Sequence, residues 1–214
     1  MQPCASVGTT TARIGVVALL FWTAAASGRE LESAGPVARE ALAVCEDADR
    51  VPTAERAARL ALGLERAEAA VQADPGDAAA HLAVFCNLGK RLRTRGGWGL
   101  LTVFSDLSRA RRAVDAALAL APDYPGALAG KGQMLAELPR WLGGDREEAE
   151  RLLRRAVAIE PEDARMRLML ADVLRAAGQR DEARAHALAA LGALERDGSE
   201  DDRATARMLV ASLQ

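Results

Sequence analysis

One recurring pattern constrains the fold of this chain more than any other feature. Asp74-Pro75, Ala121-Pro122 and Glu160-Pro161 each end an Ala- and Leu-rich stretch that reads as a helix, since these residues favour helices. Small residues stand five and twelve positions before each proline, and a similar pair follows later: Gly63 and Ala70, Ala110 and Ala117, Ala149 and Ala156, Ala183 and Ala190. Small residues seven apart share one helix face and allow close helix packing.

The last two pairs of small residues are 34 residues apart, from Ala149 to Ala183. Two helices within a 34-residue period are typical of tetratricopeptide repeats. The stretch DARMRLMLADVLRAAGQRDEARAHALAAL, 163–191, resembles that family. Leu170-Ala171 matches its apolar-small step, Gly178 its glycine between helices, and Ala183 and Ala190 its two small positions in the second helix. The same resemblance places Gly132, Ala149, Ala156 and Ala171 at helix contacts.

The pattern predicts an all-α solenoid of about three to four antiparallel helix pairs with a C-terminal capping helix. We expect an N-terminal helix and loop within 29–53, helical repeats over 54–194, and the capping helix within 195–214. The acidic start of SEDDRATARMLVASL is typical of a helix N-terminus.

Two insertions interrupt the repeats, at 91–107 and at 139–143. We interpret both as additions between the first and second helix of a pair. The stretch LPRWLGGDREEAE then contains a lengthened turn, which ends at Gly143-Gly144. Asp145 should cap the following helix, with Glu148 completing a capping box. In the other insertion the apolar spacing of Leu100, Phe104 and Leu107 predicts a second helix from about 99 to 120.

Residues 1–28 have the composition of a secretory signal peptide. Arg13 precedes an apolar run, 14–26, and small residues follow that fit a cleavage site. We therefore expect export, to the periplasm, with a mature N-terminus near Ser27. Two alternatives remain open: an uncleaved anchor in the inner membrane formed by residues 14–26, and a buried first helix.

Cys45 and Cys86 are the two cysteines that remain after such a signal is removed. They form no CxxC motif and indicate no metal site. We expect buried free thiols that pack as small apolar groups, with a disulfide as the alternative in an oxidising compartment.

The sequence contains no signature of catalysis, cofactor binding or metal binding, so we predict no enzyme activity and no cofactor. The two histidines, His81 and His186, lack the partner residues of a metal or nucleophile motif. The run Gly126–Gly132 resembles a phosphate loop but is one residue short, lacks the Ser or Thr, and follows no predicted strand. The chain has 28 basic and 30 acidic residues, and this balance argues against nucleic-acid binding.

A repeat solenoid predicts a scaffold that binds a protein or peptide partner, here in the cell envelope. Membrane contact is expected only if the N-terminal segment is uncleaved. The insertions and the GGD turn are also similar to exported bacterial repeat proteins that include the T component of TRAP-type transporters. That resemblance implies the alternative function, a small-molecule-binding accessory component of a transporter.

The candidate binding residues lie at the two insertions. Stacked repeats place equivalent turns along one edge, so we expect Trp98 and Trp141 on the same rim, with Arg91, Arg93 and Arg95 beside them. Aromatic residues and arginine are enriched at binding hot spots. In the alternative interpretation, which we favour, each tryptophan folds back over the core of its own repeat. The arginines, including Arg109, Arg111 and Arg112 further along, are interpreted as a solvated face, with a site for an anionic partner as the alternative.

Overall fold

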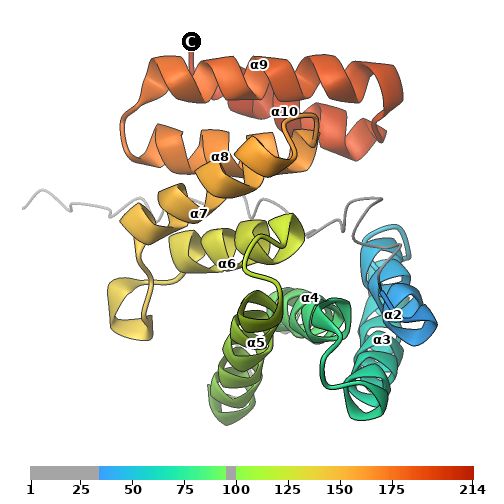
Figure 1. The fold of residues 1–214 in the computed structure, drawn as a ribbon. Coiled ribbons are helices and arrows are strands. Elements are labelled where there is room, and N and C mark those ends of the chain that lie inside the picture. Colours follow the sequence, from blue (N-terminus) through green and yellow to red (C-terminus); the bar gives the residue numbers. More distant parts are fainter. Residues whose placement is uncertain (1–33, 95–99) are drawn as a thin grey trace, which may run out of the picture.

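The computed structural model describes residues 34–94 and 100–214, and all regular elements within these ranges are helical (Figure 1). In chain order they are α2 (Pro36–Asp47), α3 (Thr53–Ala73), α4 (Ala78–Thr94), α5 (Leu100–Leu120), α6 (Pro125–Glu137), the 3-10 helix η1 (Arg140–Leu142), α7 (Arg146–Ile159), α8 (Ala164–Ala176), α9 (Arg180–Asp197) and α10 (Glu200–Ser212).

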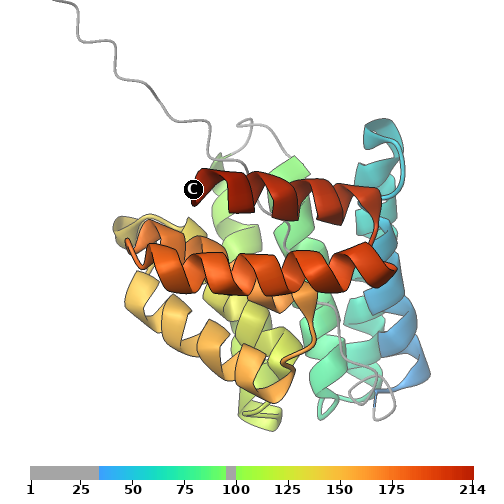
Figure 2. The same cartoon turned by 90° about the horizontal axis from the view of Figure 1, so that it is seen from above.

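The helices pair as α2–α3, α4–α5, α6–α7 and α8–α9, and α10 packs against α9 at the C-terminal end. Figure 1 shows α8 and α9 lying across the top of the molecule, whereas α2, α3 and α5 run steeply below them and α4 is seen close to end-on. Figure 2, seen from above, shows α9 and α10 side by side over the earlier helices. Successive pairs are thus rotated as they stack, and the predicted all-α solenoid is confirmed.

Local sequence sets where the helices begin. Proline occupies the first turn of α2 and α6, where its missing N–H costs no helical hydrogen bond. Side-chain oxygens cap other helices: Asp163 accepts from the Met166 backbone N–H at 2.8 Å, and Ser199 accepts from that of Asp202 at 3.2 Å. Such caps satisfy amides that have no partner inside the helix.

Small residues occupy the places where helices approach most closely. The following alanines are fully buried: Ala110, Ala117, Ala149, Ala156, Ala171, Ala183 and Ala190. Gly132 is also buried, and a Cβ at this position would lie 2.9 Å from Leu153 Cγ and 3.1 Å from the Ala149 carbonyl oxygen. The close contact between α6 and α7 therefore depends on the missing side chain.

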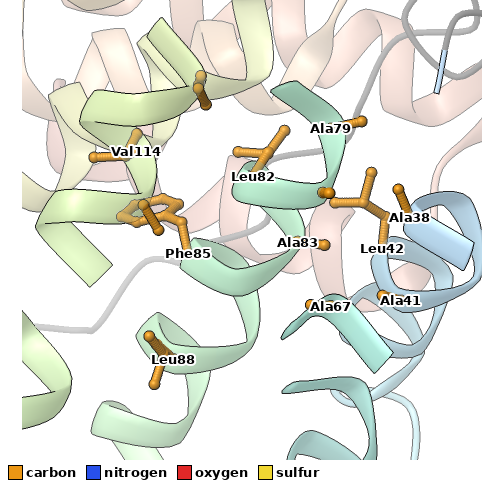
Figure 3. Close-up of a cluster of buried hydrophobic side chains, with 14 of the residues drawn as sticks. Ala38, Ala41, Leu42, Ala67, Ala79, Leu82, Ala83, Phe85, Leu88 and Val114 are labelled. Atoms are coloured by element: carbon orange, nitrogen blue, oxygen red, sulfur yellow. The ribbon is translucent and has the colours of Figure 1, made fainter. Parts of the chain in front are cut away.

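Two clusters of buried apolar residues form the core, and α6 contributes to both. In the N-terminal cluster, Phe85 of α4 lies against Val114 of α5, while Ala79 and Ala83 face the N-terminal pair α2–α3 (Figure 3). A Cβ at Gly130 of α6 would come within 2.5 Å of Phe85 Cε1. In the stretch that resembles a phosphate loop, Gly130 and Gly132 are therefore helical residues that leave room for neighbouring side chains.

A disulfide joins Cys45 of α2 to Cys86 of α4, with the two Cα atoms 6.2 Å apart. The interpretation of these cysteines as free thiols is therefore wrong. Beside the disulfide, Lys90 is 1% exposed and donates to the Cys45 carbonyl oxygen at 2.7 Å and to Asp49 Oδ2 at 2.5 Å. Burial lowers the pKa of Lys90, and the Asp49 carboxylate opposes that shift. The end of α2 is thus fixed to α4 covalently and by hydrogen bonds.

The proposed signal segment, 1–28, and the alternative anchor, 14–26, lie outside the described residues. Among the described helices, none combines the length and the apolar composition needed to cross a membrane.

Helix packing predicts a sharp contrast between two alanines of α9. Ala183 is fully buried and Ala185 is exposed. Ala183→Leu should lower the free energy of unfolding by about 1–3 kcal/mol because the larger side chain overpacks the contact. Ala185→Leu should change it by less than about 0.5 kcal/mol. Urea unfolding followed by circular dichroism measures both, and equal effects at the two sites would contradict this packing.

Candidate functional site

A groove of about 500 Å³ lies between α5 and the turn that carries η1. The α5 side is contributed by Phe104, Leu107, Ser108, Arg111, Arg112 and Asp115, and the turn contributes Trp141, Leu142 and Gly143. None of these residues belongs to the first helix of a pair. The groove is therefore built from a second helix and from the insertion in the following pair.

Helical spacing aligns the α5 side of the groove. Phe104, Ser108, Arg111 and Asp115 follow one another at intervals of four, three and four residues, which places them on one face. Leu107 is 7% exposed and belongs to the core, whereas Phe104 is 44% exposed. The groove therefore has an apolar floor and an aromatic side chain in contact with solvent.

The turn on the other side is held by its own backbone. Gly143 has φ +77°, a conformation that strains residues with a Cβ. The Gly144 N–H donates to the Pro139 carbonyl oxygen at 3.1 Å, and the Asp145 N–H donates to that of Leu135 at 3.0 Å. A Cβ at Gly144 would lie 1.7 Å from the Leu138 carbonyl oxygen. The two glycines therefore serve different needs: a left-handed backbone at one position and close chain approach at the other.

Asp145 caps α7 as expected, because its Oδ1 accepts from the Glu147 and Glu148 backbone N–H groups, each at 3.1 Å. The predicted capping box is wrong. A capping box would have the Glu148 side chain accept from the Asp145 backbone N–H. That N–H donates to the Leu135 carbonyl oxygen, and the Glu148 carboxylate accepts from Arg151 Nε at 2.7 Å.

Arg111 ties the turn to α5. Its Nη2 donates to the Leu142 carbonyl oxygen. A Cβ at Gly143 would lie 2.9 Å from the same nitrogen, so this glycine also leaves room for the guanidinium. The hydrogen bond fixes η1, and with it Trp141, against the helix that forms the opposite side of the groove.

Trp141 is 77% exposed, the largest exposure among the exposed large apolar side chains of the described residues. The interpretation that it folds back over its own repeat is therefore wrong. An indole that faces solvent beside a second exposed ring differs from the single exposed apolar residues common on protein surfaces. Trp141 and Phe104 together make this groove the strongest candidate for a binding site.

The other predicted rim residues do not surround Trp141. Arg91 donates through Nε to Asp106 Oδ2 at 3.0 Å and so links α4 to α5. Arg93 is half-buried; burial lowers its pKa, and the nearby Glu137 opposes that shift. Neither arginine lines the groove. Arg95 and Trp98 lie outside the described residues. Most of the insertion at 91–107 extends α4 and α5, and α5 begins at Leu100, close to the predicted start.

A larger hollow, with a volume of about 680 Å³, lies elsewhere, between the turns that precede α4 and α6. Its carboxylates have structural partners: Asp74 accepts from the Gly76 N–H, Asp77 caps α4, and Asp123 pairs with Arg155. Within the described ranges, no three His, Cys, Asp or Glu residues are placed to hold a metal ion. We therefore base the functional argument on the groove.

The turn should tolerate no side chain at Gly144. Gly144→Ala forces a Cβ onto the Leu138 carbonyl, and we expect a loss of about 1–3 kcal/mol of unfolding free energy from the resulting strain. Gly192→Ala is the matched control, because no atom within 4 Å would meet its Cβ. In the middle of α9 that substitution should stabilise the protein by about 0.5–1 kcal/mol. Thermal unfolding of both variants measures the difference, and a neutral Gly144→Ala would contradict the turn geometry.

The chain is similar to known helical repeat proteins in part of its sequence and in its overall fold. Residues 141–213 match the family model described as tetratricopeptide repeat. No curated protein sequence matches the chain. Among solved structures, a thermophilic tetratricopeptide repeat protein from Thermus thermophilus is similar, with a TM-score of 0.57 and 23% sequence identity. That similarity covers 81% of this chain and 80% of the other. Residues 141–213 therefore match the tetratricopeptide repeat family, within a chain that has the α-solenoid fold.

Proposed function

We propose that this protein is an exported, non-enzymatic scaffold that binds a protein partner in the cell envelope through the groove between α5 and η1. One observation carries the proposal: Trp141 is 77% exposed, on a turn that Arg111 fixes in place, and it lines the same groove as Phe104. A tetratricopeptide repeat solenoid supports it as well, because such folds present extended surfaces for binding.

The composition of the groove suits a protein surface. Tryptophan and arginine are enriched among residues that dominate binding energy, and here Trp141 lies in one groove with Arg111 and Arg112. Because Arg111 already holds the turn, the backbone of the turn loses little conformational freedom when a partner binds. The groove is therefore ready for a protein surface without rearrangement of the solenoid.

The disulfide supports export. Disulfides persist in oxidising compartments such as the bacterial periplasm, and they are rare in cytosolic proteins. The Cys45–Cys86 bond and the signal-like composition of residues 1–28 are independent features that favour the same location. Among the described residues, no feature separately favours a transporter accessory, and we do not propose that role.

Export predicts two measurable properties of the protein isolated from its own cells without reductant. Its N-terminus should lie near Ser27, and Cys45 and Cys86 should not react with a thiol-alkylating reagent until a reductant is added. Intact-protein and peptide mass spectrometry measure both. An intact Met1 together with alkylated cysteines would contradict export.

Partner binding predicts a selective effect of Trp141→Ala. The tagged mature protein should capture a defined partner from an envelope extract, and this substitution should reduce capture at least about tenfold, as expected for a hot-spot residue. The melting temperature should stay nearly unchanged because the side chain is 77% exposed. Quantitative mass spectrometry of the captured proteins provides the measurement.

Met208→Ala is the matched control for this experiment, because Met208 is 63% exposed but lies on α10, away from the groove. Capture should be unchanged in that variant. Equal capture by the wild type and by Trp141→Ala would place the partner surface elsewhere.

A further inference from the structure

We propose that the occupant of the groove is an acidic peptide segment that inserts a large apolar side chain between Phe104 and Trp141. This inference rests on the proposed function and names the chemistry of the partner. It depends on three features of the groove: two exposed aromatic rings, two arginines that bond only to neutral acceptors, and one carboxylate whose charge is compensated by a lysine.

The apolar part of the site has a floor and two sides. Leu107, 7% exposed, lies at the base, while Phe104 is 44% and Trp141 77% exposed. An aromatic side chain can bury about 150–250 Å² on binding, and pairs of rings add a further preference for edge or offset contacts. An aromatic or large aliphatic side chain placed between the two rings would remove all three apolar surfaces from water.

The charged part of the site is a pair of arginines without carboxylate partners among the described residues. Arg111 donates to the Leu142 carbonyl oxygen, and Arg112 Nη1 donates to Ser108 Oγ at 2.6 Å, so both partners are neutral. Other arginines of the stack do pair with carboxylates across helices: Arg109 with Glu68, Arg154 with Glu182, and Arg155 with Asp123. In the groove, by contrast, neither arginine forms an ion pair with a carboxylate of another described helix.

A guanidinium has five N–H donors in a planar fork that matches a carboxylate. The single bond from Arg111 to Leu142 and the single bond from Arg112 to Ser108 leave most of these donors for a ligand. Charge-assisted hydrogen bonds to carboxylates are shorter and stronger than those to neutral acceptors. The two arginines thus favour an occupant with carboxylate side chains.

The carboxylate that lines the groove does not cancel this preference. Asp115 Oδ1 accepts from Lys131 Nζ of α6 at 2.6 Å, so its charge is compensated from outside the lining residues. The local charge of the groove is positive although the chain as a whole carries a formal net charge of −2. Because the positive charge is local, it selects the part of a partner that docks here.

The test uses purified mature protein and synthetic peptides of about twelve residues labelled with a fluorophore. The first peptide carries glutamates around one tryptophan; in the others, alanine replaces the tryptophan or lysines replace the glutamates. Anisotropy titrations should show binding of the first peptide and at least about tenfold weaker binding of the other two. Affinity for the first should fall as salt rises from about 0.05 to about 0.5 M.

Protein variants separate the two parts of the site. Arg112→Glu should weaken the acidic peptide at least about tenfold and strengthen the lysine peptide, because the charge preference is reversed. Arg184→Glu is the matched control: it makes the same change in net charge on an exposed residue of α9 and should leave both affinities unchanged. Trp141→Ala should weaken the first peptide to the level of its alanine version. Circular-dichroism melts establish that each variant is folded.

Several results would overturn the inference. Equal affinity for acidic and lysine peptides, or binding that Arg112→Glu does not change, would exclude carboxylate recognition. Competition by inorganic phosphate alone at equal strength would indicate a simple anion site. A dimer in analytical ultracentrifugation that Trp141→Ala dissociates would assign the groove to a second copy of this chain.

The outcome also separates this inference from the proposed function. If Trp141→Ala abolishes capture from the envelope extract but Arg112→Glu has no effect there or on the peptides, the scaffold function stands and the acidic occupant is wrong. If Trp141→Ala leaves capture intact, the groove is not the partner surface.

Discussion

The close approach of helix backbones through positions without large side chains is the interaction on which the rest of this structure depends. A Cβ on Gly63 would lie 2.1 Å from Asn87 Oδ1, and one on Gly132 would lie 2.9 Å from Leu153 Cγ. Stacked helix pairs bury a continuous core only when neighbouring helices touch along their length. Asn87 of α4, which lies against Gly63 of α3, also reaches α2: its side-chain amide donates to the Ala41 carbonyl oxygen at 3.3 Å and, within its own helix, to that of Ala83 at 2.9 Å. The positions of the turns, and therefore of the groove, follow from this spacing.

The fold could be predicted because the features that produce it recur at fixed intervals. Small residues seven apart, and prolines after the first three second helices, give both the helix pairs and their order. The disulfide could not be predicted in the same way. Cys45 and Cys86 are 41 residues apart in different helix pairs, and whether their side chains meet depends on how α2 lies against α4. Two cysteines in a sequence do not determine that register.

The candidate site was predicted in part. The insertion at 139–143 identified Trp141, but the tendency of indoles to bury large areas favoured a folded-back side chain. That preference is wrong here because the bond from Arg111 to the Leu142 carbonyl oxygen holds the turn that carries Trp141, and the indole is exposed. Phe104 was assigned to an apolar helix stripe with Leu107, and the structure separates the two: one is exposed and the other buried. The groove face of α5 could have been identified from spacing, because residues three or four positions apart lie on one side of a helix, as Phe104, Ser108, Arg111 and Asp115 do. Arg91 was assigned to the rim because its cross-helix partner, Asp106, was not recognised.

The bond between Cys45 and Cys86 and the buried Lys90 give the helical stack two unlike ends. In a solenoid each pair contacts only its neighbours, so opening normally starts at either terminus. Here the disulfide joins the first pair to α4 of the second, while α10 packs on the last pair through noncovalent contacts, with Thr205, Ala206 and Leu209 as its buried residues. We therefore expect fraying to be directional and to begin at the C-terminal end. The α5 side of the groove packs against α4, which carries the disulfide, so partial opening of the last helices should leave α5 and its arginines in place.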